Sequence, residues 1–243
     1  MAVGAWLFAV GVCDLLRATR DSTSWRRRLV LVALGCLLLG IAAVATHLDA
    51  GGLLTVGAVW VLGLVLWLVT SSLALDPGTS RRAGWRAAAF ASLGVPVTLL
   101  VLAGGAAQGS LDSDALAGSV LADVGADRVL LAVGVGVFQT STANLVVRLL
   151  LDAVGVPAVT NEKRLRGGRV LGPMERLFIL VLGLFGELTA AAVVVAAKGL
   201  LRFPELQRTA REEGPTDVSE YFLIGSLASW LLALAGLVVV RLA

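Results

Sequence analysis

The chain has 243 residues, of which 58% are hydrophobic and 15% charged, and its formal net charge is +3 at pH 7. Soluble domains carry more charge, and a single soluble core of this size has no use for so many apolar residues. The composition excludes a disordered chain, a secreted disulfide scaffold and a soluble enzyme. About 141 apolar residues (58% of 243), at ~20 residues per crossing, predict about seven transmembrane helices.

Apolar stretches in chain order define the predicted spans: 2–16, 29–46, 51–75, 83–107, 129–151, 173–197 and 220–241. The first stretch is the shortest, and its positive charges follow the apolar run, so we expect an uncleaved span rather than a signal peptide. We predict an all-α polytopic bundle that forms a single transmembrane domain over residues 1–243. We expect it to be a multi-pass protein of the cell membrane.

Segments rich in Lys and Arg alternate along the chain with connections that contain few of them. Segments 17–28, 76–86 and 148–176, together with Arg241, carry 15 of the 20 Lys and Arg residues, and the intervening connections carry five. Lys and Arg are enriched on the cytoplasmic side of membrane proteins. Seven spans with the amino terminus outside and the carboxyl terminus in the cytoplasm satisfy this rule.

Residues that bind metals or form disulfides are scarce. The chain has one histidine, His47, and two cysteines, Cys13 and Cys36, which lie within apolar runs. Such thiols behave as small hydrophobic groups, and one histidine cannot build a multi-histidine metal centre. We expect no metal, no cofactor and no nucleic-acid partner.

Span five contains polar residues at helical spacing. Four of them recur at every fourth position and so share one helix face: Thr140, Asn144, Arg148 and Asp152. Such a stripe avoids lipid, and it serves either hydrogen bonding between helices or a functional site.

Span six carries Glu187 within its apolar run, twelve residues after Glu175. In two antiparallel spans, Glu187 and Gln139 would lie at a similar depth, near the middle of the membrane. A carboxylate there is either protonated or paired with a donor. The candidate intramembrane polar cluster therefore comprises Gln139, Thr140, Asn144, Arg148 and Glu187.

Charged residues also mark the ends of the last two spans. The candidate interface constellation comprises Glu175, Arg176, Lys198, Arg202, Glu220 and Tyr221. Glu220 either pairs with Lys198 or Arg202, or these two cations bind an anionic headgroup or phosphate. Span seven also repeats small residues at every fourth position, which favours close helix packing: Gly225, Ser229 and Ala233.

Three motifs in the last third of the chain carry a resemblance. They are Gly168-x3-Gly172-x2-Glu175-Arg176, Ala196-Ala197-Lys198-x3-Arg202-Phe203 and Glu220-Tyr221-x-Leu223-Ile224-Gly225-Ser226-Leu227. Over about 168–230 the chain resembles a family of uncharacterised prokaryotic polytopic membrane proteins. The resemblance implies that the six charged and tyrosine residues of these motifs belong to one constellation, and it implies no activity. Many relatives carry an H-x3-D-F-x2-Q pattern in an amino-terminal domain, and this chain lacks it.

Three functions remain open at this point. The first is a membrane protein that binds or transports a small molecule, ion or lipid, with Glu187 as a protonatable group. The second is a structural or interaction subunit, whose partner is another membrane protein or a second copy of the chain. The third is an intramembrane enzyme acting on a lipid phosphate, which lacks a recognisable nucleophile–base pair.

Overall fold

The computed structural model describes residues 1–17, 25–76, 78–103, 111, 122–156, 168–213 and 217–243, with the backbone alone described at 168–169, 201–213 and 217–219. Over these ranges the chain forms nine α-helices and one short 3-10 helix, without a strand, which confirms the predicted all-α fold. The chain divides into two compact units, Met1–Thr142 and Ala143–Ala243, and each is described by itself.

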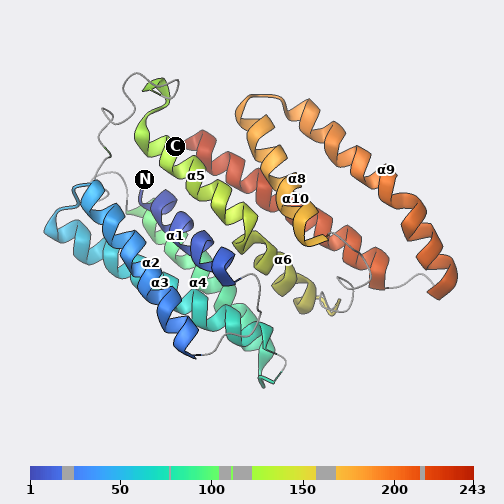
Figure 1. The fold of residues 1–243 in the computed structure, drawn as a ribbon, viewed down its shortest axis with the longest axis horizontal. Coiled ribbons are helices and arrows are strands. Elements are labelled where there is room, and N and C mark those ends of the chain that lie inside the picture. The colour runs from blue at the N-terminus through green and yellow to red at the C-terminus, as the bar shows by residue number, and fades with distance from the viewer. Residues whose placement is uncertain (18–24, 77, 104–110, 112–121, 157–167, 214–216) are drawn as a thin grey trace. The chain divides into compact units, whose positions relative to one another are not determined.

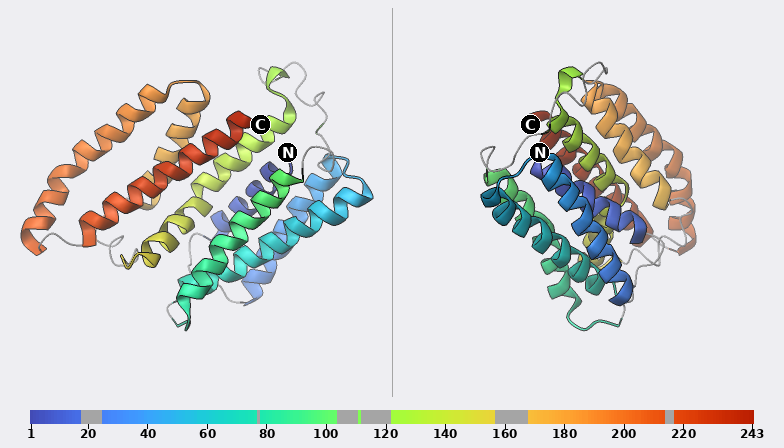
Figure 2. Two further views of the ribbon diagram at one scale, coloured as in Figure 1. Left: turned by 180° about the vertical axis from the view of Figure 1, so that it is seen from behind. Right: turned by 60° about the vertical axis from the view of Figure 1, so that its left-hand side comes forward.

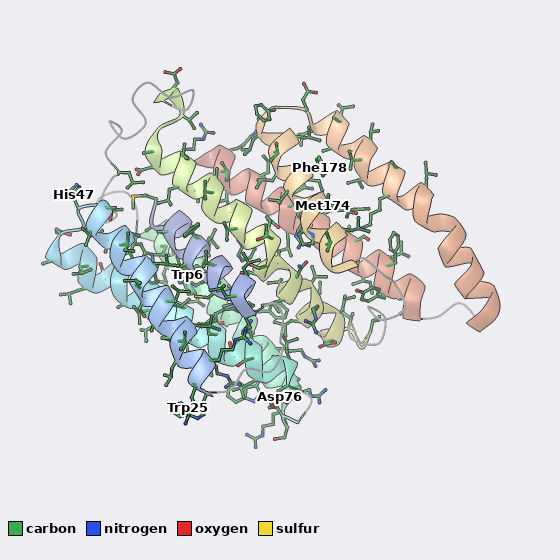
Figure 3. All side chains as sticks on the ribbon, viewed as in Figure 1. Trp6, Trp25, His47, Asp76, Met174 and Phe178 are labelled. Carbon is green, nitrogen blue, oxygen red and sulfur yellow. The ribbon has the colours of Figure 1, made fainter. Side chains whose placement is uncertain are left out.

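Among the described residues, the first unit contains five α-helices and the short η3, which can be followed in Figure 1. Their bounds are α1 (Ala2–Arg17), α2 (Trp25–Ala45), α3 (Ala50–Leu75), α4 (Arg82–Leu102), η3 (Ala122–Val124) and α5 (Ala126–Thr140). Trp25, at the start of α2, and Asp76, after α3, lie at one end of this unit, and His47, between α2 and α3, lies at the other (Figure 3). Helices α2 and α3 therefore run in opposite directions.

Helix α1 forms the centre of the first unit, although it is the shortest predicted span. Twelve of its 16 residues are buried, against four of the 21 in α2. It packs against α2, α3, α4 and α5 (Figure 2). The indoles of Trp6 and Trp60 cross-link α1 and α3, because each donates to a carbonyl oxygen of the opposite helix, at 3.1 and 3.0 Å.

Glycines let α1 and α5 approach each other closely. A Cβ at Gly4 would lie 2.7 Å from the Cα of Leu131, and a Cβ at Gly134 would overlap the carbonyl oxygen of Gly4. Small residues at a helix contact allow backbones to approach, which is the packing that membrane helices favour. The two helices run parallel, since Ser141, just after α5, donates to the carbonyl oxygen of Gly11 at 2.7 Å.

The predicted span 129–151 is broken at its polar run. Helix α5 ends at Thr140, α6 (Thr142–Ala153) begins two residues later, and the pair is bent by 46°. The hydroxyl of Thr140 donates to the carbonyl oxygen of Val137 at 2.7 Å, and that of Ser141 bonds to α1. Hydroxyls that bond back onto the preceding turn bend helices. The predicted stripe is thus interrupted between Thr140 and Asn144.

The second unit contains α6 and three further helices, α8 (Gly168–Leu184), α9 (Leu188–Glu213) and α10 (Asp217–Leu242). Figure 1 shows α8 and α9 joined by a short turn, with α10 beside α8. Helices α8 and α10 run parallel. Arg176 bonds to Ser229, a Cβ at Gly183 would overlap the Leu237 side chain, and Arg241 donates to the Gly183 carbonyl oxygen at 2.5 Å.

The prediction of one helix over 173–197 is wrong, because α8 ends eleven residues after Pro173 and the chain reverses. Gly186 adopts φ +87°, the left-handed conformation that glycine favours. The amides of Gly186 and Glu187 donate to the carbonyl oxygens of Gly183 and Leu182, at 3.1 and 2.8 Å. These two bonds form a Schellman motif, which satisfies the last carbonyls of a helix and ends it.

Four of the described helices are long and apolar enough to cross a membrane, namely α2, α3, α4 and Glu220–Leu242 of α10, and the bent pair α5–α6 makes a fifth if it counts as one span. Several apolar helices of this length indicate a membrane-embedded protein. Seven spans and their orientation stay predictions.

Candidate functional site

A charged pair joins α8 and α9 in the second unit. Glu175 lies eleven residues before Gly186 and Lys198 lies twelve after it, so the two face each other across the hairpin. The Lys198 ammonium is 2.6 Å from Oε2 of Glu175, and the two side chains are 19% and 10% exposed. The ammonium also lies 5.6 Å from the centre of the Phe222 ring on α10, within the range of a cation–π contact.

Arg176 is the buried cation beside this pair. It is 1% exposed, and its guanidinium donates to Oγ of Ser229 at 2.8 Å and to Oδ1 of Asn144 at 2.5 Å. These bonds link α8 to α10 and α6. Gly172, one turn before Arg176, lies beside these bonds, since a Cβ there would be in ordinary contact with the guanidinium at 3.5 Å and with the Asn144 oxygen at 3.6 Å.

Some members of the predicted interface constellation are brought together. Lys198 forms its ion pair with Glu175, and Glu220 is exposed. Tyr221 packs against Leu151 and Val156, in a small apolar cluster. Arg202 lies on α9 among the residues whose side chains the structure does not describe. We name Glu175, Arg176, Lys198 and Phe222 the charge cluster.

The predicted intramembrane polar cluster is divided among different elements. Gln139 is buried on α5, Thr140 bonds back to its own helix, and Asn144 and Arg148 lie on α6. Glu187 is exposed in the turn between α8 and α9, so its predicted position inside one continuous helix is wrong.

The first unit contains a second buried charge pair, which the sequence analysis did not predict. In the first unit, Asp14 and Arg17 of α1 lie 3.0 Å apart at their closest atoms, with side chains 0% and 4% exposed. Oδ2 of Asp14 accepts bonds of 2.8 Å from the Trp67 indole and the Thr142 hydroxyl. Arg17 donates to Ser71 at 3.0 Å. The signal was an acid and a base three residues apart at the end of an apolar run, a spacing that places them on one helix face.

The small-residue face of α10, predicted to serve close helix packing, is half-buried at Gly225 and buried at Ser229 and Ala233. Ser229 is 5% and Ala233 0% exposed, and Ala233 packs with Ile179 and Ala191. A Cβ at Gly225 would meet the Leu151 side chain at 3.6 Å. This face therefore serves helix packing and orients Ser229 toward Arg176.

The fold and these charges define the class of the protein, a membrane-embedded helical protein with charged side chains buried between its helices. No family model, curated protein or solved structure matches the chain. The resemblance noted over 168–230 therefore stays a prediction.

Proposed function

We propose that this chain is a multi-pass protein of the cell membrane that binds an anionic, phosphate-bearing ligand at the charge cluster. The ligand chemistry fits a phospholipid headgroup, and inorganic phosphate or another small phosphate shares it. Binding is favoured over catalysis, because the cluster supplies cations and one carboxylate without a nucleophile beside a base. Glu187 has no part in this proposal.

The observation that carries the proposal is the Lys198 ammonium. A lysine has three N–H donors, and among the residues described Lys198 donates to one acceptor, Glu175. Its side chain is 19% exposed, so the remaining donors are accessible. N–H donors that lie next to hydrocarbon without an acceptor raise the free energy of the protein. Phosphate oxygens would accept hydrogen bonds from these donors of Lys198.

Apolar side chains border the same part of α8. Leu171 and Phe178 lie four residues before and three residues after Glu175, which places them beside it on the helix surface. They are 40% and 50% exposed, and Phe178 is labelled on α8 in Figure 3. A headgroup at Lys198 would leave its acyl chains next to this apolar surface. This arrangement favours a lipid over a free phosphate.

The test measures lipid binding by native mass spectrometry of purified protein supplied with phosphatidylglycerol or phosphatidylcholine. We expect Lys198→Met to lower phosphatidylglycerol binding about tenfold and to leave phosphatidylcholine binding unchanged. Arg241→Met is the matched control, since it removes one positive charge at the other end of α10. Equal losses in both variants would contradict the proposal. Displacement of the lipid by inorganic phosphate would identify the free anion as the ligand.

A second candidate is a structural or interaction subunit. It is favoured by the Asp14–Arg17 pair, whose side chains are almost completely buried and bonded within the first unit. Such a pair holds helices together without facing a ligand. Chemical cross-linking in native membranes, followed by mass spectrometry, would recover a partner in constant ratio if this candidate is right, and a solitary chain would count against it.

A further inference from the structure

We propose that the α8–α9 turn and the carboxyl terminus face the same, outer side of the membrane, and that the charge cluster opens toward the cytoplasmic leaflet. The second part rests on the proposed function, and it names the ligand as an anionic phospholipid of that leaflet. The first part depends only on helix directions and on the positions of basic residues in the second unit.

The helix directions follow from contacts between α8 and α10. Arg176 bonds to Ser229 near the middle of the two helices, and Arg241 bonds to the carbonyl oxygen of Gly183 at their carboxyl ends. The two helices are therefore parallel. Helix α9, which lies between them in chain order, runs in the opposite direction. Consequently the end of α10 and the turn that contains Glu187 lie at one end of this unit, and the starts of α8 and α10 lie at the other.

Basic residues are concentrated at the end where α8 and α10 start. The start of α8, together with the second half of α9, carries four of them: Arg169, Arg202, Arg208 and Arg211. Residues 177–197 and 225–243, which lead to the opposite end, contain a single basic residue, Arg241. Because Lys and Arg mark the cytoplasmic side, the end with these four residues is cytoplasmic and Ala243 is outside.

This orientation differs from the one expected from the sequence. With 173–197 taken as one crossing, Ala243 shares the cytoplasmic side with 148–176. The turn at Gly186 adds one reversal of the chain, so that four helices, rather than three, separate the α5–α6 break from the carboxyl terminus. The apolar part of α9, Leu188–Leu200, is ~20 Å long at 1.5 Å per residue, and its charged second half continues at the basic end.

Within the charge cluster, the Lys198 ammonium and Phe222 lie toward the basic end of the unit. The Lys198 ammonium contacts the ring of Phe222, which is two residues from Glu220, where the apolar part of α10 begins. A long lysine side chain reaches from the hydrocarbon edge to the polar headgroups. Its phosphate ligand would therefore come from the leaflet at this end.

Cysteine labelling tests the orientation. In a background with Cys13→Ala and Cys36→Ala, three exposed positions are changed one at a time: Val154→Cys, Glu187→Cys and Ala243→Cys. We expect a membrane-impermeant maleimide to label positions 187 and 243 in intact expressing cells and position 154 only after permeabilisation. Labelling after detergent solubilisation shows that each thiol reacts.

Two results would overturn the orientation: labelling of 243 together with 154 and on the opposite side from 187, or failure of 187 to react in intact cells while 243 stays protected. The leaflet is tested separately in sealed vesicles that receive phosphatidylglycerol in their outer leaflet by cyclodextrin exchange. We expect a rise in thermal stability only in inside-out vesicles, and its loss in Lys198→Met. A rise only in right-side-out vesicles would overturn the leaflet assignment and leave the labelling result standing.

Discussion

The buried charge pairs of the two units differ in how far they are exposed. In the first unit, Asp14 and Arg17 are sealed within the helix bundle, with side chains 0% and 4% exposed and bonds to Trp67, Thr142 and Ser71. In the second unit, Lys198 and Glu175 are 19% and 10% exposed. A sealed pair stabilises the arrangement of helices, whereas a partly open pair retains donors that a ligand can use.

The physical difference is how far each pair is buried. Removing one member of a fully buried pair leaves a charge without water or a partner, which destabilises a protein strongly. When one member of a partly exposed pair is removed, the other can still reach water or polar headgroups, so its loss changes stability less. Mutations in the two units should therefore have separable effects on stability and on ligand binding.

The largest effect is expected from Asp14→Ala, which leaves Arg17 buried and unpaired. We expect the free energy of unfolding to fall by about 3–5 kcal/mol, measured by denaturant titration in detergent micelles. Asp76→Ala is the control, because Asp76 lies in the α3–α4 connection, and its carboxylate accepts a local bond from the amide of Gly78. A smaller effect at Asp14 than at Asp76 would contradict the sealed-pair interpretation.

The next effect is expected from Gly134→Ala, where the added Cβ would overlap the backbone of α1 at Gly4. Backbone atoms cannot rotate away, so we expect a loss of about 1–3 kcal/mol, as in overpacked cores. Gly136→Ala, in the same helix, meets nothing within 4 Å and should leave the melting temperature unchanged or raised. Equal melting temperatures for the two variants would show that α1 and α5 do not approach closely.

Gly186→Ala tests the turn that separates the second unit from its predicted single helix. A left-handed conformation is unfavourable by about 1–2 kcal/mol for a residue with a Cβ, and we expect a stability loss of that size. Gly199→Ala on α9 adds a Cβ in open space and within a helix, so it should be neutral or stabilising. A stabilised Gly186→Ala variant would favour one continuous helix.

The smallest effect on stability is expected from Lys198→Met. Because the pair with Glu175 is partly exposed, its loss should change the free energy of unfolding by less than about 1 kcal/mol, while lipid binding falls. A loss as large as that of Asp14→Ala would place Lys198 among the structural charges of the bundle and remove the distinction between the units.

Much of the helical fold could be predicted from the sequence, because long apolar runs form helices wherever backbone groups must bond internally. The stretches 29–46, 51–75 and 220–241 correspond closely to α2, α3 and α10. The breaks could not be predicted from hydropathy. Gly186 lies within an apolar run, and Ser141 lies within a short polar run that a continuous helix could also contain. Each becomes a break through hydrogen bonds that only the folded chain provides.

The charged residues show the same division. Glu175, Arg176 and Lys198 stood out in the sequence because charge is rare within apolar segments, yet the choice of partners depended on the hairpin register. The sequence by itself determined that this is an all-α, apolar chain with few charged residues inside its apolar stretches. Composition and periodicity can be taken directly from the order of residues, without knowledge of their contacts. Tertiary structure alone decided that Asp14 is sealed, that Lys198 faces Glu175 and that α8 and α10 are parallel, because these depend on contacts between residues far apart in the chain.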